Sequence, residues 1–330
     1  MDKIKWGIIG CGDVTEMKSG PAFQKVPHSE LVAVMRRDAE KAADYARRHE
    51  VPNWYASADL LINDPGVNAI YVATPPDTHA YYAKKAIEAG KPVYIEKPMC
   101  RTYDECMEVV SLAEKKNVPV FVAYYRRILP GFLKVKALID DGSIGEVRMV
   151  SIQLFKHPVE ERMDNIPWRV DPAIAGAGHF FDLASHQFDF LDYILGPVTE
   201  VKSIVANQMG IYQAEDILSV TWKFQNGILG SGIWCFNAAK ENDRDIVEII
   251  GSKGRIEFST FDFSPVKLFS GKDYSEFDFP KPDHVQYDLI EQVVNHLRGT
   301  DTAVSTGVSG ARTNQLLEKI ITKFYHTNNQ

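Results

Sequence analysis

A short apolar strand that runs directly into a glycine turn is the most constraining feature of this chain, and it lies at the very N-terminus. Gly10 allows a tight turn, and Gly12 leaves room for the backbone to approach a pyrophosphate. A helix beginning at Asp13 and Val14 would direct its N-terminal N–H groups at the same phosphate. Thr15 stands where such turns usually carry a third glycine. Alone, the turn leaves dinucleotide binding and a plain structural turn equally open.

Short apolar runs alternate with helical patterns through the first third of the chain. Continuous apolar runs between helices are typical of a parallel sheet that is covered on both faces. We therefore predict a doubly wound, Rossmann-type parallel sheet over residues 1–123. After the first strand, the predicted strands are residues 31–34, 69–73, 93–95 and 120–123, and the predicted helices are residues 38–49, 77–89 and 103–116.

The pattern changes to mostly strands over residues 124–330, where we predict an α+β domain with a large, mainly antiparallel sheet that is open on one face. Gln225-Asn226-Gly227 lies between two apolar runs and predicts a hairpin with a type I′ turn. We expect loops such as residues 157–170 to determine which substrate binds. Further predicted elements are a pair of strands at residues 246–250 and 255–258 and helices at residues 130–140 and 311–326.

Composition excludes several classes of function. The formal net charge of −7 argues against nucleic acid, which requires a basic surface. No run of about 18 apolar residues is present, so we expect no membrane span. The N-terminus enters a strand at once, so we expect no signal peptide. The four cysteines lack metal-ligand spacing and indicate free thiols in a cytoplasmic protein without a metal site.

Two predicted strands of the first domain end in residues that could carry chemistry. The first is followed by Thr74 and Pro75, with His79 five residues after Thr74. One interpretation places Thr74, Pro75 and His79 beside a cofactor, because ligands bind beyond the carboxyl ends of such strands. The other is a proline turn in which Asp77 caps the next helix. These residues alone favour the second interpretation.

The other strand end carries Glu96-Lys97-Pro98. An ammonium at this position would lie at the mouth of the cofactor crevice and could polarise an oxygen or transfer a proton. The alternative is a solvated Lys97 that pairs with Glu96. Pro98 favours the functional interpretation, because it stiffens the turn and limits where Lys97 can point.

The end of the second strand predicts the form of the cofactor. NAD sites usually place an acidic residue there to bind the ribose 2′-hydroxyl. Here Arg36 and Arg37 occupy that position, and Asp38 follows as the expected N-cap of the next helix. Two guanidiniums suit the 2′-phosphate of NADP. The alternative is a basic surface turn.

In the second domain, Asp182 and His186 are spaced by four residues on a predicted helix and therefore share one of its faces. Asp189 follows three residues later and could hold the imidazole of His186. The helix is apolar on most sides, and ionisable groups on such a helix should face a partner or a cavity, because burial alone is costly. The alternative is an exposed or structural pair.

Three further residues are candidate ligand contacts. Trp168 and Arg169 could offer an aromatic plane and a charged fork to a polar ligand, although a packing tryptophan beside a surface arginine explains them nearly as well. We also expect Arg126, at the start of the second domain, to contact the substrate.

Together these motifs resemble the Gfo/Idh/MocA oxidoreductases, the family of glucose–fructose oxidoreductase and inositol dehydrogenase. The resemblance covers essentially the whole chain, and Glu-Lys-Pro followed by Asp-x-x-x-His is specific in combination. The sequence departs from the family at Thr15, and at Ala177 and Ala184, which replace glycines of the second-domain motif. The matching residues are Gly10-Cys11-Gly12, Ala73-Thr74-Pro75 with His79, Glu96-Lys97-Pro98, Trp168-Arg169, Gly176-Ala177-Gly178 and Asp182, His186 and Asp189.

The resemblance implies a Rossmann domain and an open-faced α/β domain with NAD(H) or NADP(H) between them. It also implies that Lys97, Asp182 and His186 form the catalytic group. The expected cofactor-binding residues are Gly10, Gly12, Asp13, Val14, Arg36, Arg37, Thr74, Pro75, His79, Glu96, Lys97, Trp168 and Arg169. The expected substrate-binding residues are Lys97, Arg126, Arg169, Asp182 and His186.

We therefore expect an NADP-dependent oxidoreductase, with NAD as the alternative cofactor, that transfers hydride between nicotinamide and a secondary alcohol or ketone of a sugar, polyol or related small molecule. The arginine-bearing second strand is similar to that of the NADP-using aldose, anhydrofructose and dihydrodiol dehydrogenases. An NAD-dependent glycosidase of the same fold and a catalytically silent NAD(P)-sensing regulator stay open. We also expect a homodimer or homotetramer built on the open sheet, because residues 219–236 are rich in apolar side chains.

Overall fold

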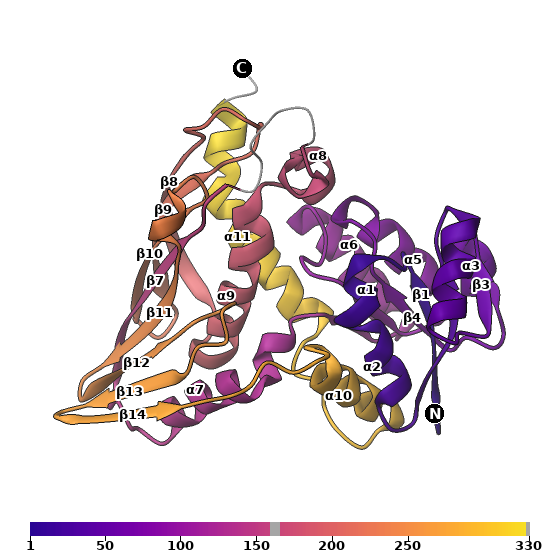
Figure 1. Cartoon of the computed structure of the whole chain (residues 1–330), viewed down its shortest axis with the longest axis horizontal. Coiled ribbons are helices and arrows are strands. Elements are labelled where there is room, and N and C mark those ends of the chain that lie inside the picture. The colour runs from indigo at the N-terminus through magenta and orange to yellow at the C-terminus, as the bar shows by residue number, and fades with distance from the viewer. Residues whose placement is uncertain (159–165, 328–330) are drawn as a thin grey trace. The chain divides into compact units, whose positions relative to one another are not determined.

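The computed structural model describes residues 1–158 and 166–327, so the middle of the predicted specificity loop lies outside the described residues. The chain divides into two compact units (Figure 1). Unit 1 consists of residues 1–125 and 282–314, and unit 2 consists of residues 126–281 and 315–330. Among the described residues, no helix is both long enough and apolar enough to cross a membrane.

Unit 1 is built on a six-stranded, wholly parallel sheet with the order β3-β2-β1-β4-β5-β6. This order confirms the predicted doubly wound topology, which switches direction between β1 and β4. Nucleotides bind beyond the carboxyl ends of the strands at such a switch point. The strands are β1 (Ile4–Ile9), β2 (Ser29–Met35), β3 (Asn53–Tyr55), β4 (Ala69–Val72), β5 (Val93–Ile95) and β6 (Val120–Val122).

The two faces of this sheet carry different cores. On one face, Trp6 and Tyr71 pack against Phe23 of α2 (Gly20–Lys25), with ring centroids 4.9 and 5.1 Å from the Phe23 ring. The other face is aliphatic and packs against α5 (His79–Glu88) and α6 (Tyr103–Lys116). Burial on both faces explains the continuous apolar runs in the sequence. The other helices of residues 1–125 are α1 (Asp13–Met17), α3 (Ala39–Arg48) and α4 (Ala58–Asn63).

The helix predicted from residue 77 begins later than expected. Residues 76–78 form a turn of 3-10 helix, and α5 starts at His79. Asp77 lies inside the 3-10 turn, and the N-cap residue of α5 is Thr78, without a side-chain capping bond. The prediction that Asp77 caps this helix is therefore wrong. Asp38 does cap α3, because its carboxylate accepts the N–H of Lys41 at 3.1 Å.

Unit 1 also contains a segment from the C-terminal half of the chain. We expected residues 124–330 to form one domain, whereas residues 282–314 cluster with the first 125 residues. They contain α10 (Tyr287–Arg298) and the first turns of α11 (Gly307–Thr327). Two interactions hold this segment in unit 1. The apolar face of α10 is buried, and the Ser305 hydroxyl donates to the carbonyl oxygen of Val122 at 2.7 Å.

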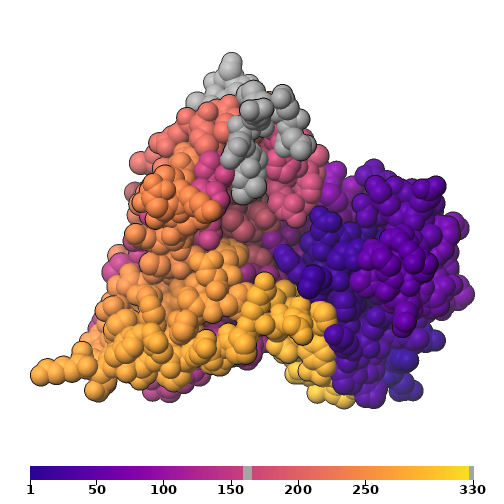
Figure 2. All heavy atoms as spheres, in the orientation of Figure 1, coloured from indigo at the N-terminus to yellow at the C-terminus, as the bar shows by residue number. Residues whose placement is uncertain are grey.

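Unit 2 is built on an eight-stranded mixed sheet with the order β14-β13-β12-β11-β7-β10-β9-β8. All neighbouring strands are antiparallel except β7 and β10, which confirms the mainly antiparallel sheet. The β13–β14 hairpin projects at one end of the sheet (Figure 2). The strands are β7 (Val147–Phe155), β8 (Val198–Ala206), β9 (Ile217–Phe224), β10 (Leu229–Cys235), β11 (Arg244–Gly251), β12 (Gly254–Phe258), β13 (Val266–Ser270) and β14 (Asp273–Phe277).

The helices of unit 2 cover one face of this sheet (Figure 1). Phe188 of α9 (His179–Leu195) packs against Trp222 of β9 and Trp234 of β10. Phe132 of α7 (Pro130–Asp140) packs against Phe258 of β12. The opposite face exposes aliphatic side chains, and in the described part of the chain no helix lies over it. α8 (Pro172–Ala175) is a single turn that precedes α9.

The turn between β9 and β10 differs from its prediction. The hairpin itself is confirmed, because the two strands pair antiparallel. A type I′ turn requires positive φ at two successive central residues, but in this loop only Gly227 has a positive φ, of 89°. Phe224 and Ile228 close a three-residue loop through a backbone hydrogen bond of 2.9 Å. Such loops place their glycine last, at the left-handed position.

Candidate active site

The glycine turn of unit 1 packs against the end of β4. Gly10 has φ of +93°, and a Cβ there would lie 2.7 Å from the Thr74 side chain. Only glycine therefore fits at this position. Gly12 is the N-cap of α1, and its N–H donates to the Thr15 hydroxyl at 2.9 Å, while that hydroxyl donates to the Gly12 carbonyl at 2.8 Å. Thr15 thus closes the turn with its own side chain in place of a small residue.

The structure brings Arg36 to this turn. Its guanidinium donates from Nη1 to the carbonyl oxygen of Cys11 at 3.3 Å, and Nη1 lies 4.0 Å from the position that a Cβ on Gly12 would take. Arg37 is exposed, and Asp38 is occupied as the cap of α3. The half-buried cation beside the turn is therefore Arg36. Burial raises the pKa of the Cys11 thiol to about 11, so Cys11 adds no negative charge at neutral pH.

His79 joins the end of β4 to the loop after β5. Its ring is buried, with Nε2 at 2.6 Å from the carbonyl oxygen of Thr74 and Nδ1 at 3.1 Å from that of Pro98. Burial lowers the pKa of His79. The imidazole therefore braces the loops that carry Thr74 and Lys97. Direct contact of Thr74, Pro75 or His79 with a cofactor stays a prediction.

Glu96 is buried and points into unit 1. Its Oε1 accepts hydrogen bonds from the hydroxyl of Tyr71 and from Nε2 of Gln286, the latter at 2.5 Å. Its Oε2 accepts the backbone N–H of Lys97 at 3.1 Å. Burial and the Glu96 charge hold the pKa of Tyr71 well above its usual range, so the phenol stays a donor. The carboxylate thus fixes the backbone of half-buried Lys97, which precedes a cis peptide to Pro98.

In unit 2, α9 carries the other predicted catalytic residues. Asp182 is half-buried, and His186 is buried one turn later with its ring centroid 6.0 Å from that of Phe261. Arg169 brings its Nε within 4.0 Å of an Asp182 oxygen. Its guanidinium stacks on the Trp168 ring at 4.6 Å. The structure therefore groups Trp168, Arg169 and Asp182, and their contact with a cofactor or substrate stays a prediction.

Asp189 and Arg126 have different surroundings from those expected. Asp189 is buried and accepts hydrogen bonds from Nε and Nη2 of Arg127 at 2.7 and 2.8 Å, so its carboxylate serves a buried ion pair. Arg126 is also buried, donates to the carbonyl oxygen of Thr260 at 2.8 Å and lies over the Phe261 ring. The geometry makes both residues part of the core around α9. Substrate contact by Arg126 stays a prediction.

Sequence reasoning missed Arg127, Gln286 and Glu215. Glu215 precedes β9 and is fully buried, and its Oε1 accepts the N–H of Gly178, the N-cap of α9, at 3.1 Å. Its Oε2 accepts the Tyr325 hydroxyl at 2.6 Å. Burial raises the pKa of Glu215 to about 7. The available signal was an acidic pair at residues 215–216 directly before an apolar strand.

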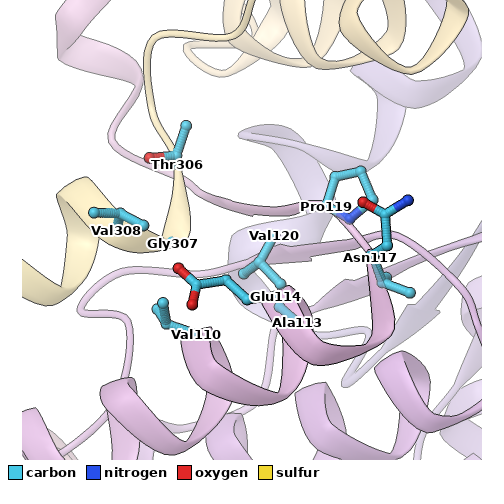
Figure 3. A pocket seen from close by; sticks show the side chains of 10 residues that line it. Val110, Ala113, Glu114, Asn117, Pro119, Val120, Thr306, Gly307 and Val308 are labelled. Carbon is cyan, nitrogen blue, oxygen red and sulfur yellow. The ribbon is translucent and has the colours of Figure 1, made fainter.

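Unit 1 contains a pocket of about 230 Å³, and Figure 3 shows side chains that line it. It lies between the C-terminal end of α6 and the start of α11, beside Val120 at the beginning of β6. The glycine turn lies at the opposite, carboxyl edge of the sheet, so this pocket is not the predicted cofactor crevice. It is lined by Val110, Ala113, Glu114, Asn117, Val118, Pro119, Val120, Thr306, Gly307 and Val308.

Comparison with known proteins gives consistent matches over both units. Residues 4–124 match the model of an oxidoreductase family with an NAD-binding Rossmann fold, and residues 132–257 match the GFO/IDH/MocA C-terminal domain. Oxidoreductase P35 of Formosa agariphila is 41% identical over 302 residues, which cover 89% of this chain and 91% of that protein.

Two further relatives are more distant. A trans-1,2-dihydrobenzene-1,2-diol dehydrogenase of Sus scrofa is 26% identical over 279 residues, 84% of this chain and 80% of that protein. The structure of a levoglucosan dehydrogenase in complex with NADH and levoglucosan matches with a TM-score of 0.87 at 22% identity, covering 97% of this chain and 96% of that chain. The match to the levoglucosan dehydrogenase structure supports the fold alone.

Proposed function

Because the chain belongs to the GFO/IDH/MocA oxidoreductase family, with its NAD-binding Rossmann fold, we propose that it transfers hydride between NADP and a secondary alcohol or ketone of a sugar, polyol or related small molecule. The observation that carries the proposal is the pair of candidate sites. Lys97 follows β5 at the carboxyl edge of the Rossmann sheet, and α9 presents Asp182 and His186 one turn apart.

The glycine turn fits a dinucleotide, because Gly10 and Gly12 keep side chains away from the backbone that would approach a pyrophosphate. NADP is supported by Arg36, whose guanidinium lies beside that turn. Asp38, the nearest carboxylate in sequence, is engaged in capping α3. A cation without a competing carboxylate favours a 2′-phosphate over a 2′-hydroxyl.

The nicotinamide supplies the hydride chemistry, and the protein's own side chains handle the proton. As hydride leaves the substrate carbon, the adjacent hydroxyl must lose its proton, and His186 is the base because an imidazole titrates near neutral pH. Lys97 stabilises the developing alkoxide with its positive charge. Asp182 orients the substrate or balances that charge. Trp168 and Arg169 contribute to binding.

Turnover of a panel of sugars, polyols and dihydrodiols with NADP and with NAD tests the proposal. His186→Ala should lower kcat by about 10²–10⁴-fold with cofactor affinity intact. An unchanged kcat in His186→Ala beside a collapsed one in Lys97→Met would assign the proton transfer to the lysine. His326→Ala and Lys116→Met, at exposed positions on α11 and α6, are the matched controls.

Retention of a tightly held NAD through dialysis, together with cleavage of glycosides, would replace the proposal by the glycosidase function. Cofactor binding without turnover of any substrate would indicate a sensor. Release of NADP on dialysis together with alcohol oxidation supports the proposal.

We further propose that the enzyme is cytoplasmic, in keeping with its four free cysteines, and that two copies associate through the uncovered face of the unit 2 sheet. Ile204, Leu229 and Ile233 are 78%, 57% and 43% exposed on that face. These aliphatic side chains lie on β8 and β10, which flank β9, and exposed apolar side chains on one face of a sheet favour burial by a partner.

A further inference from the structure

The start of α9 is pressed closely against the segment that precedes β9. Gly178, the N-cap of α9, has so little space that a Cβ would lie 2.8 Å from the Ala214 side chain and 2.9 Å from the Glu215 carbonyl oxygen. The helix that carries Asp182 and His186 therefore begins at a fixed place on this segment.

Glu215 makes that contact specific. One of its carboxylate oxygens accepts the N–H of Gly178 at 3.1 Å, and the other accepts the hydroxyl of Tyr325 at 2.6 Å. Gly178 begins α9 and Tyr325 lies in the last turns of α11, so one fully buried side chain joins three segments that are distant in sequence. A displacement of Glu215 would move the first turn of α9.

Ionisation would strengthen both hydrogen bonds of Glu215, but burial of the carboxyl group opposes ionisation. A carboxylate at a helix N-terminus interacts favourably with the positive end of the helix dipole, and hydrogen bonds to an ionised acceptor are stronger than those to a neutral one. The ionisable groups that act on Glu215 are Tyr325 on α11 and Asp216 beside it. The Asp216 carboxylate is turned away, because it accepts the N–H groups of Gln208 and Met209.

We propose that Glu215 is a positioning residue that, with Tyr325, holds the N-terminal turn of α9 where Asp182 and His186 act. This inference rests on the proposed function. The two hydrogen bonds of this fully buried carboxyl group carry the inference.

Glu215→Gln and Tyr325→Phe test the proposal, and Tyr274→Phe is the matched control, because it removes a tyrosine–glutamate hydrogen bond on the exposed β14 strand. Either test variant should lower kcat by about 10- to 100-fold, since small displacements of catalytic groups are costly. The KM for NADP should stay within about twofold of the wild-type value. Tyr274→Phe should leave both parameters unchanged.

Hydrogen exchange of the first-turn amides of α9 gives a readout that does not need turnover. At a fixed pH, protection of these amides relative to their intrinsic exchange rates should be lower in Glu215→Gln and in Tyr325→Phe than in the wild type, because each variant removes part of the link. Wild-type protection and kcat in both Glu215→Gln and Tyr325→Phe would overturn the inference. If no substrate is found, exchange alone decides the inference, and the proposed function fails separately.

Discussion

The buried ion pair between Arg127 and Asp189 should be a major determinant of the stability of unit 2. The side chains are 3% and 1% exposed, and two parallel N–H donors of Arg127 lie 2.7 and 2.8 Å from the two oxygens of Asp189. Asp192 lies 3.7 Å from the same guanidinium. Arg127→Met removes the guanidinium that both Asp189 and Asp192 face, and the Asp189 carboxylate is fully buried.

The magnitude follows from the cost of an uncompensated buried charge. Breaking a buried, bidentate pair by removing one partner costs about 3–5 kcal/mol, whereas replacing both partners by apolar side chains is often close to neutral. For a domain of this size that loss lowers Tm by on the order of 10 °C. The double variant Arg127→Met with Asp189→Leu should therefore recover most of the stability that Arg127→Met loses.

Urea unfolding followed by circular dichroism measures these free energies. Arg47→Met is the matched control, because Arg47 pairs with Asp44 at 2.5 Å while the two side chains are 76% and 47% exposed, and an exposed pair is worth less than about 1 kcal/mol. The reasoning is refuted if Arg127→Met unfolds with the same free energy as Arg47→Met, or if the double variant is as unstable as the sum of its single changes.

Three further predictions concern the cofactor turn, the open sheet and Glu215. Changing Arg36 and Arg37 together to alanine should weaken NADP binding by about 10- to 100-fold in a fluorescence titration while NAD binding changes little, and equal wild-type affinity for both cofactors would contradict this. If two copies associate through the open sheet as proposed, Leu229→Glu should give a monomer in light scattering, and a wild-type monomer would end the proposal. Because the pKa of Glu215 is raised from 4.5 to about 7, the folded state binds more protons than the unfolded state between these values. The free energy of unfolding should therefore fall by about 3 kcal/mol as pH rises through this window, and Glu215→Gln should remove that slope.

The sequence by itself determined the class of both sheets, one parallel and one mainly antiparallel. A strand that is buried on both faces appears in the sequence as a continuous apolar run, so the parallel sheet of unit 1 could be predicted from neighbouring residues. The β9–β10 hairpin could be predicted in the same way, because its turn residues have a local pattern of their own. The glycine turn was readable for the same reason, because Gly10 and Gly12 directly follow the apolar residues of the first strand. Asp38 could be identified as a helix cap because its partner is only three residues away.

Only the tertiary structure decided what the polar side chains bind. Asp189 appeared available to His186, three residues before it, but it pairs with Arg127, 62 residues away. Glu96 finds Gln286 at a separation of 190 residues, and Glu215 finds Gly178 and Tyr325 at separations of 37 and 110. Hydrophobic periodicity encodes which face of an element is buried, but carries no information about which distant donor meets a buried carboxylate. Residues 282–314 pack in unit 1 for the same reason, because an amphipathic helix requires an apolar surface and its sequence does not specify which one.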